Sequence, residues 1–338
     1  GTAVAQPASS DDAADSDFRQ VKRPGSVDLD AEYDLANLRI PRDQIHTLLP
    51  RDAIPALTNP ETEPASEADW LPADARIILV EHNDDVLGVP LRILDWHEVV
   101  NDKVGGEPVA ITYCPLCDSA TVFSRRVATE DGEPVTFEFG VSGALYNSNV
   151  LMYDKRDKAL WSQLGMRAVS GPLAGASLDH LPVQLVSFES FRQRHPDAPI
   201  VSRNTGHKRD YSRSPYASYM STDVVMVPVA GVGDALPRKT LGLGVAHGDE
   251  AWFIPIDLLD QPFTLRTPAG PLTARRTDAG IHVDQAPDDV HTAQTFYYSW
   301  SAFYPDTAVI HAVIHERPAD HDDTRDADDD NANSPADP

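Results

Sequence analysis

Cysteine is scarce in this chain, which has two among its 338 residues, Cys114 and Cys117. So few thiols exclude a small scaffold stapled by disulfides, and one chain cannot supply a zinc site of four cysteines. Long apolar runs are also missing, since none approaches the roughly 18 residues that cross a bilayer. We therefore expect a mature chain that does not span a membrane and whose 41% hydrophobic residues form one large or two modest globular domains.

Positive charge is in short supply as well. The chain has 28 basic and 53 acidic residues, which gives a formal net charge of -25. Because phosphates would be repelled, this balance argues against nucleic acid and anionic membrane surfaces as partners. Only six of the basic residues are lysines. An acidic composition poor in lysine indicates a halophilic protein, and an acidic protein from an ordinary environment is the alternative.

Both ends of the chain are polar and acidic. We expect residues 1–37 to form a flexible leader that tethers the protein, and residues 317–338 to form a disordered tail. The opening GTAVAQ resembles the small-residue end of an export signal, and a removed lipid-bearing cysteine before Gly1 would leave the same start. Either interpretation predicts an exported protein, extracellular or at the cell surface, with a possible N-terminal membrane anchor. An arbitrary chain boundary is the alternative.

An internal repeat organises the middle of the sequence. Residues 71–95 and 236–260 align without a gap at an offset of 165, and share prolines, histidines and aspartates. Each copy predicts a strand, a tight turn, a second strand and a short helix that starts near a proline. A weaker echo links residues 191–197 and 300–306, which we expect to be short helices ending at a proline.

The repeat predicts two related halves, residues 38–225 and 226–316, with chance similarity as the alternative. Helical periodicity is scarce, and residues 95–102 and 187–195 are the main helix candidates. The predicted fold class is α+β, rich in β-structure, with two related halves and short helices. The runs that predict strands in the first half are residues 108–113, 120–127, 134–141, 149–154 and 159–163.

The segment Tyr113-Cys114-Pro115-Leu116-Cys117 places both thiols in a CxxC spacing. Haem attachment would need a histidine next, where the chain has Asp118, and a thioredoxin-like site would need a following helix, where a strand is predicted. A corner between two strands favours a metal knuckle, with a labile redox pair or an inert disulfide as alternatives. In the redox alternative Cys114 and Cys117 are the catalytic pair, and we expect Cys114 to be the exposed, attacking thiol.

Two thiolates are too few for a stable metal site, so other ligands are needed. His97, on a predicted short helix before the motif, is the first candidate, and Met152 and Met166 are softer ones. Thiolates with an imidazole and a thioether suit copper, whereas thiolates and an imidazole with water suit zinc. The predicted ligands are Cys114, Cys117, His97 and Met152, with copper expected and zinc possible. The alternative is that His97 and Met152 serve packing alone.

Several strings in this sequence are similar to those of an uncharacterised prokaryotic domain family of unknown function, marked by WHExVND and TYCPLC. The resemblance implies a β-rich protein that is exported or tethered to a membrane, and it brings no established activity. The strings are LPRDAIPALTNP (49–60), PLRILDWHEVVND (90–102), VGGEPVAITYCPLC (104–117), FGVSGALYNSNVLMYD (139–154) and SGPLAG (170–175).

Two further clusters carry charge. Residues 203–213 form a basic island that could hold an anion or face an acidic partner, although arginine–carboxylate pairs within the protein are the preferred interpretation. The second cluster could ligate a metal, but a solvated acidic loop is the preferred interpretation. Its members are His282, Asp284, Asp288, Asp289 and His291.

Three functions follow from these patterns. The first is soft-metal binding or electron transfer outside the cytoplasm, with a metal ion as partner. The second is thiol–disulfide chemistry with a redox partner protein. The third is a non-catalytic cell-surface scaffold that contacts other cell-surface proteins. No phosphate-binding loop or hydrolase nucleophile motif supports a fourth.

Overall fold

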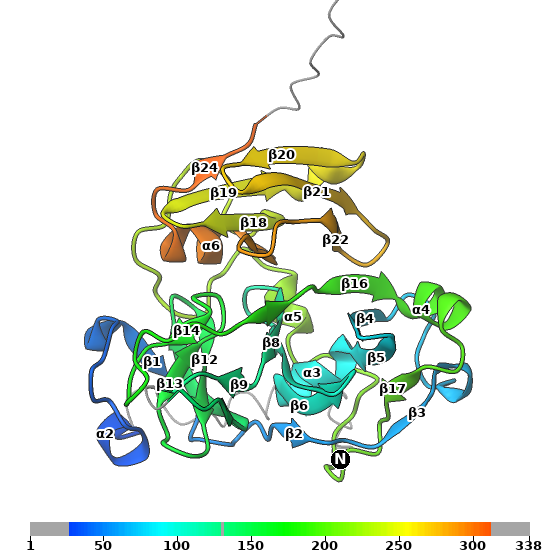
Figure 1. Ribbon diagram of the computed structural model, residues 1–338, viewed down its shortest axis with the longest axis horizontal. Helices are drawn as coiled ribbons and strands as arrows, with labels where there is room; N and C mark the ends of the chain where they lie inside the picture. The colour runs from blue at the N-terminus through cyan, green and yellow to red at the C-terminus, as the bar shows by residue number, and fades with distance from the viewer. Residues whose placement is uncertain (1–26, 130–131, 312–338) are drawn as a thin grey trace, which may run out of the picture.

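The computed structural model describes residues 27–129 and 132–311 (Figure 1). Strands in several sheets dominate it and the helices are short, which confirms a β-rich fold. In this described part, no helix is long and apolar enough to cross a membrane. The predicted tail, residues 317–338, and most of the predicted leader lie outside the described residues. The helical elements are α2 (Leu29–Glu32), η1 (Arg42–Gln44), η2 (Ala65–Glu67), α3 (Leu91–His97), α4 (Phe188–Arg194), α5 (Ala217–Met220), η3 (Ile256–Leu259) and α6 (Tyr297–Phe303).

The first copy of the repeat forms the centre of an eight-stranded sheet. Its apolar run gives a strand with residues 77–80 buried, and the turn at Asn83-Asp84, with positive φ at both residues, returns the chain as a hairpin. A short helix starts directly after Pro90, as predicted. In spatial order the strands are β20 (Phe263–Thr267), β21 (Gly270–Arg276), β22 (Ile281–Gln285), β16 (Gln184–Ser187), β4 (Arg76–His82), β5 (Asp85–Pro90), β17 (Pro199–Val201) and β3 (Thr62–Pro64).

The second copy forms the hairpin of a four-stranded sheet. Its two strands begin and end at positions 165 residues after those of β4 and β5. β4 and β5 are flanked by antiparallel β16 and parallel β17, and the second hairpin has an antiparallel and a parallel neighbour in the same places. The strand order is β23 (His291–Phe296), β18 (Leu241–His247), β19 (Glu250–Pro255) and β24 (Ala308–Val309).

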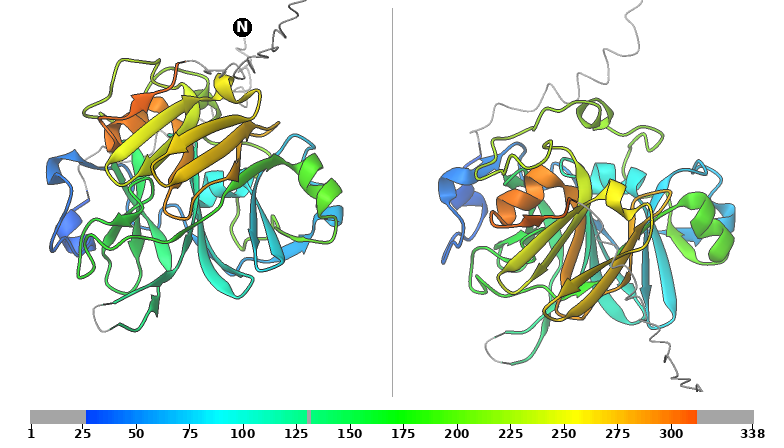
Figure 2. Two further views of the ribbon diagram at one scale, coloured as in Figure 1. Left: turned by 45° about the horizontal axis from the view of Figure 1, so that its top comes forward. Right: turned by 90° about the horizontal axis from the view of Figure 1, so that it is seen from above.

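The two halves are not separated in space. β22, from the second half, pairs with β16 through His282 and Gln184, and so continues the sheet of the first half. One core cluster also contains Trp161 from the first half and Trp300 from the second, both fully buried. Figures 1 and 2 show the second half lying across the first, with α6 between its sheet and the body below.

Between α3 and β16 the first half carries an insertion built mainly from two five-stranded sheets. The strands predicted in this part of the chain are confirmed. The helix predicted at residues 95–102 is wrong beyond His97, where α3 ends. Glu98 has a left-handed φ of 55°, which ends the helix, and β-branched Val99 and Val100 continue as a strand. The sheets and the small ladder beside them are β15 (His180–Leu181), β8 (Ser119–Ser124), β7 (Glu107–Cys114), β6 (Val99–Val104) and β2 (Leu57–Thr58); β1 (Ile45–Thr47), β11 (Phe139–Tyr146), β12 (Asn149–Asp154), β13 (Leu160–Ser162) and β14 (Arg167–Ala168); and β10 (Val135–Thr136) with β9 (Arg126–Val127).

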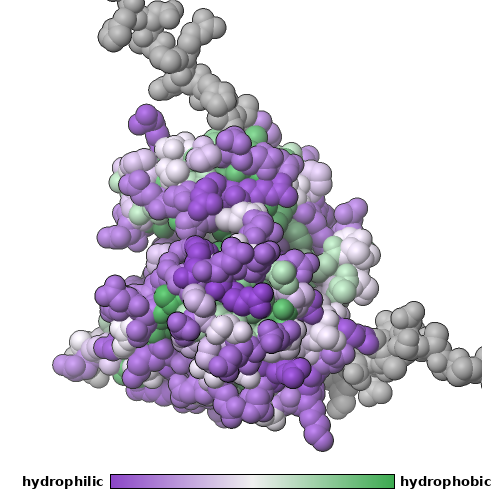
Figure 3. All heavy atoms as spheres, turned by 90° about the vertical axis from the view of Figure 1, so that its right-hand side faces the viewer, coloured by the Kyte–Doolittle hydropathy of each residue, from purple (hydrophilic) through white to green (hydrophobic). Residues whose placement is uncertain are grey.

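The surface of the protein is largely polar. The face in Figure 3 is largely hydrophilic, with small separate hydrophobic areas. Val224 and Met226 are large hydrophobic residues that stay exposed, and both lie in the long connection between β17 and β18. Most apolar side chains of the described residues are therefore used in the core.

Candidate functional site: a buried thiol pair

Cys114 and Cys117 lie at a corner between two strands, as the sequence predicts. Cys114 is the last residue of β7, and its register partner Ser119 is the first residue of β8. The Cys117 amide donates to the Cys114 carbonyl at 3.3 Å, and Asp118 has a positive φ of 49°. This tight turn brings the two sulfurs to the same side of the corner, where the Cys114 thiol hydrogen bonds to Cys117.

Both cysteines are free thiols and both are buried, with 1% of Cys114 and none of Cys117 exposed. The Cys117 sulfur has polar neighbours, with Ser119 Oγ at 3.1 Å and Asn149 Nδ2 at 3.2 Å. A weaker contact comes from the Ser299 hydroxyl, which has no partner at ordinary hydrogen-bond geometry among the described residues. The sulfur therefore sits among donors that favour its ionised form.

The two thiols differ in acidity because of these neighbours. Burial alone would raise the pKa of Cys117, but its hydrogen bonds, with those from Cys114 and Asn149 among them, outweigh it and bring that pKa below its usual value. Burial and the adjacent Cys117 sulfur raise the pKa of Cys114 well above its usual value. Cys117 is thus the more acidic thiol of the pair, whereas the sequence favoured Cys114 as the attacking thiol.

A buried amide network fixes the donors around the sulfur. Asn149 Oδ1 accepts the Leu164 amide, so its Nδ2 must face the other way, toward Cys117 and toward Gln163 Oε1 at 2.7 Å. Ser119 donates to the same Gln163 oxygen at 2.8 Å. Gln163 Nε2 is itself held by Thr112 Oγ1 at 3.0 Å. Each member is buried, so the orientation of the network is set by these bonds rather than by solvent.

The residues that surround the Cys117 sulfur do not form a recognisable pattern in the sequence. Ser119, Asn149, Gln163 and Ser299 come from four different elements or their ends. The available signal was Asn149, an amide at the start of the otherwise apolar strand NVLMYD.

The second half of the chain closes the other side of the turn. The Leu116 carbonyl accepts hydrogen bonds from Tyr219 at 2.9 Å and from Tyr298, on α6, at 2.7 Å. The Cys117 carbonyl accepts the Phe296 amide at 2.9 Å. The thiol turn is therefore clamped between the insertion of the first half and the sheet of the second.

A buried carboxyl group lies in the same region. Glu98 caps α3, and its Oε1 accepts the Tyr216 hydroxyl at 3.1 Å. Burial, together with the negative charges of Cys117 and Asp95, raises the pKa of Glu98 to about 8 despite the bond from Tyr216. Glu98 is thus held mainly as a neutral acid near the Cys117 sulfur.

The structure places His97 at the end of α3, fully buried, with both ring nitrogens engaged. Nδ1 lies 2.7 Å from the Pro55 carbonyl, and Nε2 lies 2.7 Å from the Tyr211 hydroxyl. Because a carbonyl oxygen can only accept, Nδ1 carries the proton and Nε2 accepts from Tyr211. Burial, followed by the nearby His207, lowers the pKa of His97 to about 4 despite the bond to Pro55. The imidazole is neutral, and its free electron pair is already in use.

Met152 and Met166 pack in the same apolar cluster as both cysteines. Met152 is fully buried in β12, opposite Trp161 of the neighbouring strand. Within residues 27–129 and 132–311, no group of three or more His, Cys, Asp or Glu side chains is close enough together to hold a metal ion. The copper or zinc site with Cys114, Cys117, His97 and Met152 stays a prediction.

The two charged clusters found in the sequence behave differently. In the part of the chain that the structure describes, Arg203, Lys208, Arg209 and Arg213 make no ion pair, so the island is not held by internal pairs there. Arg209 instead lies 5.6 Å from the centre of the Trp96 ring.

The second cluster does not assemble as one site. His282 pairs with Asp284 at 3.2 Å, whereas Asp289 pairs with His247 at 2.9 Å. His291 lies against His180 of β15 with the rings tilted and their centres 5.2 Å apart, and its Nδ1 is buried without a partner among the described residues.

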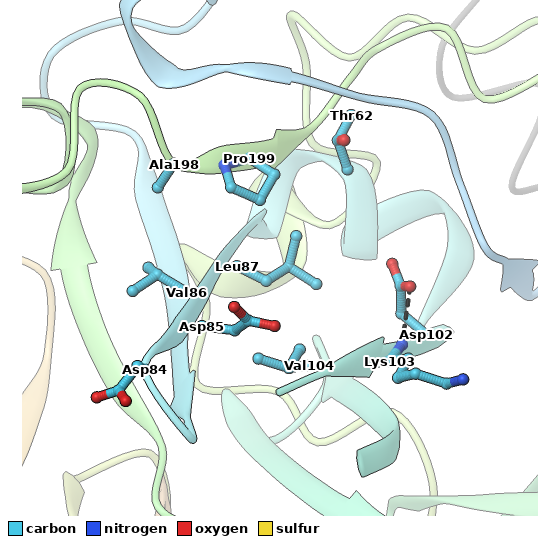
Figure 4. A pocket seen from close by; sticks show the side chains of 10 residues that line it. All are labelled: Thr62, Asp84, Asp85, Val86, Leu87, Asp102, Lys103, Val104, Ala198 and Pro199. Carbon is cyan, nitrogen blue, oxygen red and sulfur yellow. Dashed lines mark hydrogen bonds between the residues drawn. The ribbon is translucent and has the colours of Figure 1, made fainter. Parts of the chain in front are cut away.

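A cavity of about 490 Å³ opens elsewhere, between the β4–β5 turn, β6 and β17 (Figure 4). None of the residues that line it belongs to the predicted site. It is lined by Thr62, Asp84, Asp85, Val86, Leu87, Asp102, Lys103, Val104, Ala198 and Pro199.

Comparison with known proteins gives one result. Residues 51–286 match a family described as a protein of unknown function, DUF3179. No curated protein and no solved structure matches the chain. The matched residues include the whole insertion and both cysteines and make up more than half of the chain. The chain therefore belongs to the DUF3179 family of proteins of unknown function.

Proposed function

We propose that this protein carries out thiol–disulfide exchange, with Cys117 as the attacking sulfur and Cys114 as its partner. The observation that carries the proposal is the hydrogen bond that the Asn149 amide donates to the Cys117 sulfur at 3.2 Å, with the orientation of that amide fixed by its bonds to Leu164 and Gln163. Such donors stabilise a thiolate, which is the form that attacks a disulfide. An inert buried thiol has no need of them, since neutral cysteine packs as a small apolar side chain.

The reaction proceeds in two steps. The Cys117 thiolate attacks one sulfur of a partner disulfide, forms a mixed disulfide and expels the other partner sulfur as a thiolate. Cys114 then loses its proton and attacks the Cys117 sulfur, which forms the Cys114–Cys117 disulfide and expels the second partner thiolate. The partner gains two electrons, and the expelled thiolates take up protons according to their pKa. The reverse sequence oxidises a partner dithiol.

Copper binding is the second candidate function, and zinc is the less favoured ion. The donors that stabilise the Cys117 thiolate would equally suit a soft metal ligand, and Met152 shares the core cluster with both sulfurs. His97 could join only if the Tyr211 hydroxyl left its Nε2, because that nitrogen is already an acceptor. This extra displacement is why we rank metal binding below redox chemistry.

The two candidates are separated by a redox titration and a metal measurement on the same protein. We expect purified wild type to hold no stoichiometric metal and to form the Cys114–Cys117 disulfide in one two-electron transition, within the range of roughly -300 to -120 mV that spans known exchange proteins and labile pairs. Alkylation and mass analysis would measure it. Stoichiometric copper or zinc that is lost in Cys114→Ser and Cys117→Ser would favour the metal site instead. A metal-free pair that stays reduced in every buffer would leave a non-catalytic cell-surface scaffold.

The setting of this chemistry is also part of the proposal. We propose an extracytoplasmic location, secreted or anchored, because exchangeable disulfides persist in oxidising compartments. We further propose that two four-strand units, β16-β4-β5-β17 within the eight-stranded sheet and the sheet β23-β18-β19-β24, arose by duplication. Their shared strand order and the constant offset of 165 residues between the paired hairpins support it.

A further inference from the structure

The thiol pair has a problem of access that any partner must solve. Cys114 and Cys117 are 1% and 0% exposed, so no disulfide can reach them in the closed structure. On the insertion side they are enclosed by continuous ladders of β7, β8, β11 and β12. Opening there would break sheet hydrogen bonds. The other side is covered by α6 and by residues 214–240, which we call the strap.

The strap has little regular structure of its own. It contains only the four-residue helix α5 and runs along the outside of the molecule (Figure 2). In the described structure, residues 223–236 make no backbone–backbone hydrogen bond. Val224 and Met226 leave 64% and 39% of their surface exposed. Tyr216, Tyr219 and Val227 still anchor the strap in the core cluster. The lack of backbone bonds over residues 223–236 is the feature that the strap shares with segments that open locally at low free energy.

A small number of side-chain bonds hold the strap down over the turn. The Tyr219 hydroxyl donates to the Leu116 carbonyl, between the two cysteines, at 2.9 Å. Lys239 Nζ donates to the Tyr219 and Thr222 carbonyls, both at 2.7 Å, and lies 3.5 Å from the centre of the Tyr219 ring. The Tyr216 hydroxyl adds a bond to Glu98. Releasing these contacts would open the strap side of the turn without breaking a strand pairing, while Tyr298 and Phe296 keep the other side in place.

We infer that the strap is the gate of the thiol pair, opened by local release of Tyr219 from the Leu116 carbonyl and closed by the clamp of Lys239 on Tyr219. The inference rests on the proposed function, because a gate is needed only if a partner disulfide must reach the two thiols. It concerns access alone, and is therefore measured without any redox partner.

The test is native-state alkylation of the reduced protein in increasing urea. The chain has no other cysteines, so the added mass reports this pair alone. For wild type we expect a slow rate that stays flat at low urea, because local opening exposes little surface. Lys239→Met removes two bonds from a charged donor, and should raise the rate about tenfold or more. Tyr219→Phe should raise it too.

Lys155→Met is the matched control, since it removes a surface lysine that pairs with Glu138 away from the strap, and its rate should equal that of wild type. Global unfolding is measured for every variant. The inference is overturned if the wild-type rate rises from the lowest urea with the slope of global unfolding, or if Lys239→Met speeds alkylation only as much as it lowers global stability. A gated pair that never forms a disulfide would contradict the proposed function and leave the gate intact. A redox-active pair that is reached only by global unfolding would support the proposed function and contradict the gate.

Discussion

The eight-stranded and the four-stranded sheet are built around the same arrangement of four strands, yet only the first arrangement is followed by a candidate site. In both, a hairpin lies between an antiparallel and a parallel strand and is followed by a short helical segment. After α3 the chain builds β6 to β14, which carry the cysteines and most of their donors. After η3 it builds only β20 to β22, which extend the first sheet. The common sheets thus supply the framework, and the insertion supplies the chemistry.

The packing of the two sheets differs in one instructive detail. Phe191 of α4 lies over Gly88 of β5, where an added Cβ would come within 2.7 Å of the ring. Trp300 of α6 lies over Gly244 of β18, where the gap would be 2.2 Å. Each helix therefore needs a glycine beneath its aromatic ring, but the glycine lies on a different strand. The arrangement of strands is therefore shared, but the helix packs on a different strand position in each of the two sheets.

The largest effect should come from removing these rings. Phe191→Ala and Trp300→Ala each delete a fully buried aromatic side chain, and we expect each to lower the free energy of unfolding by about 3–5 kcal/mol. Urea unfolding measures the loss. Trp300→Ala should also speed alkylation of the thiols, because Tyr298 and Ser299 lie on the same helix, whereas Phe191→Ala should not beyond its effect on global stability. Equal alkylation rates in the two variants would contradict the distinction between the sheets.

A smaller effect should come from the histidine pair between the halves, His180 and His291. Burial lowers the pKa of His180 to about 4 and also lowers that of His291. A histidine with a lowered folded pKa contributes its stability above about pH 6.5, and loses it as the pH falls toward 4. We expect a loss on the order of 2 kcal/mol after solvent screening. In His180→Gln the free energy of unfolding should depend less on pH in that window. An unchanged pH dependence would show that the histidine pair does not contribute to it.

The insertion can be probed through Asn149 without touching either sulfur. Asn149→Ala removes one donor to an ionised sulfur, worth about 1.5–3 kcal/mol, so the pKa of Cys117 should rise by roughly 1–2 units. The pH dependence of alkylation measures this. Gln184→Ala, which removes an amide bonded to Glu81 on the shared sheet, is the control and should leave the profile unchanged. If the pH dependence of alkylation is unchanged in Asn149→Ala, the Asn149 amide does not stabilise the Cys117 thiolate.

The smallest effect concerns the surface of both halves together. A net charge of -25 repels itself, and raising KCl from 0.1 to 1 M shortens the screening length from about 10 to about 3 Å. We expect the free energy of unfolding to rise by about 1 kcal/mol or more over that range. Thermal unfolding in a KCl series measures it, and a fall in stability would contradict the halophilic interpretation.

Much of the framework could be predicted from sequence because its signals are local. The offset of 165 residues located both hairpins, and the apolar run at 149–154 located β12. The helix predicted at 95–102 was wrong beyond His97, since nothing in the sequence marked Glu98 as left-handed. Local patterns do not encode a single residue that leaves the helical region.

The site was predictable only in part. The spacing of Cys114 and Cys117 placed them at a strand corner, but their acidity depends on Asn149 and other groups that are distant in sequence. His97 is near the site in sequence, yet Pro55 and Tyr211 occupy its nitrogens. Such tertiary contacts decide the chemistry, and spacing alone does not report them.

The most direct test of the central claim is to trap the mixed disulfide. Single-cysteine variants Cys114→Ser and Cys117→Ser would be mixed with a small symmetric disulfide near neutral pH, and the adduct followed by mass. We predict that Cys117, left alone in Cys114→Ser, forms the adduct at least tenfold faster than Cys114 does in Cys117→Ser, because the Asn149 amide favours the Cys117 thiolate whereas burial outweighs the backbone hydrogen bond to Cys114. Equal rates, or faster reaction at Cys114, would contradict the account.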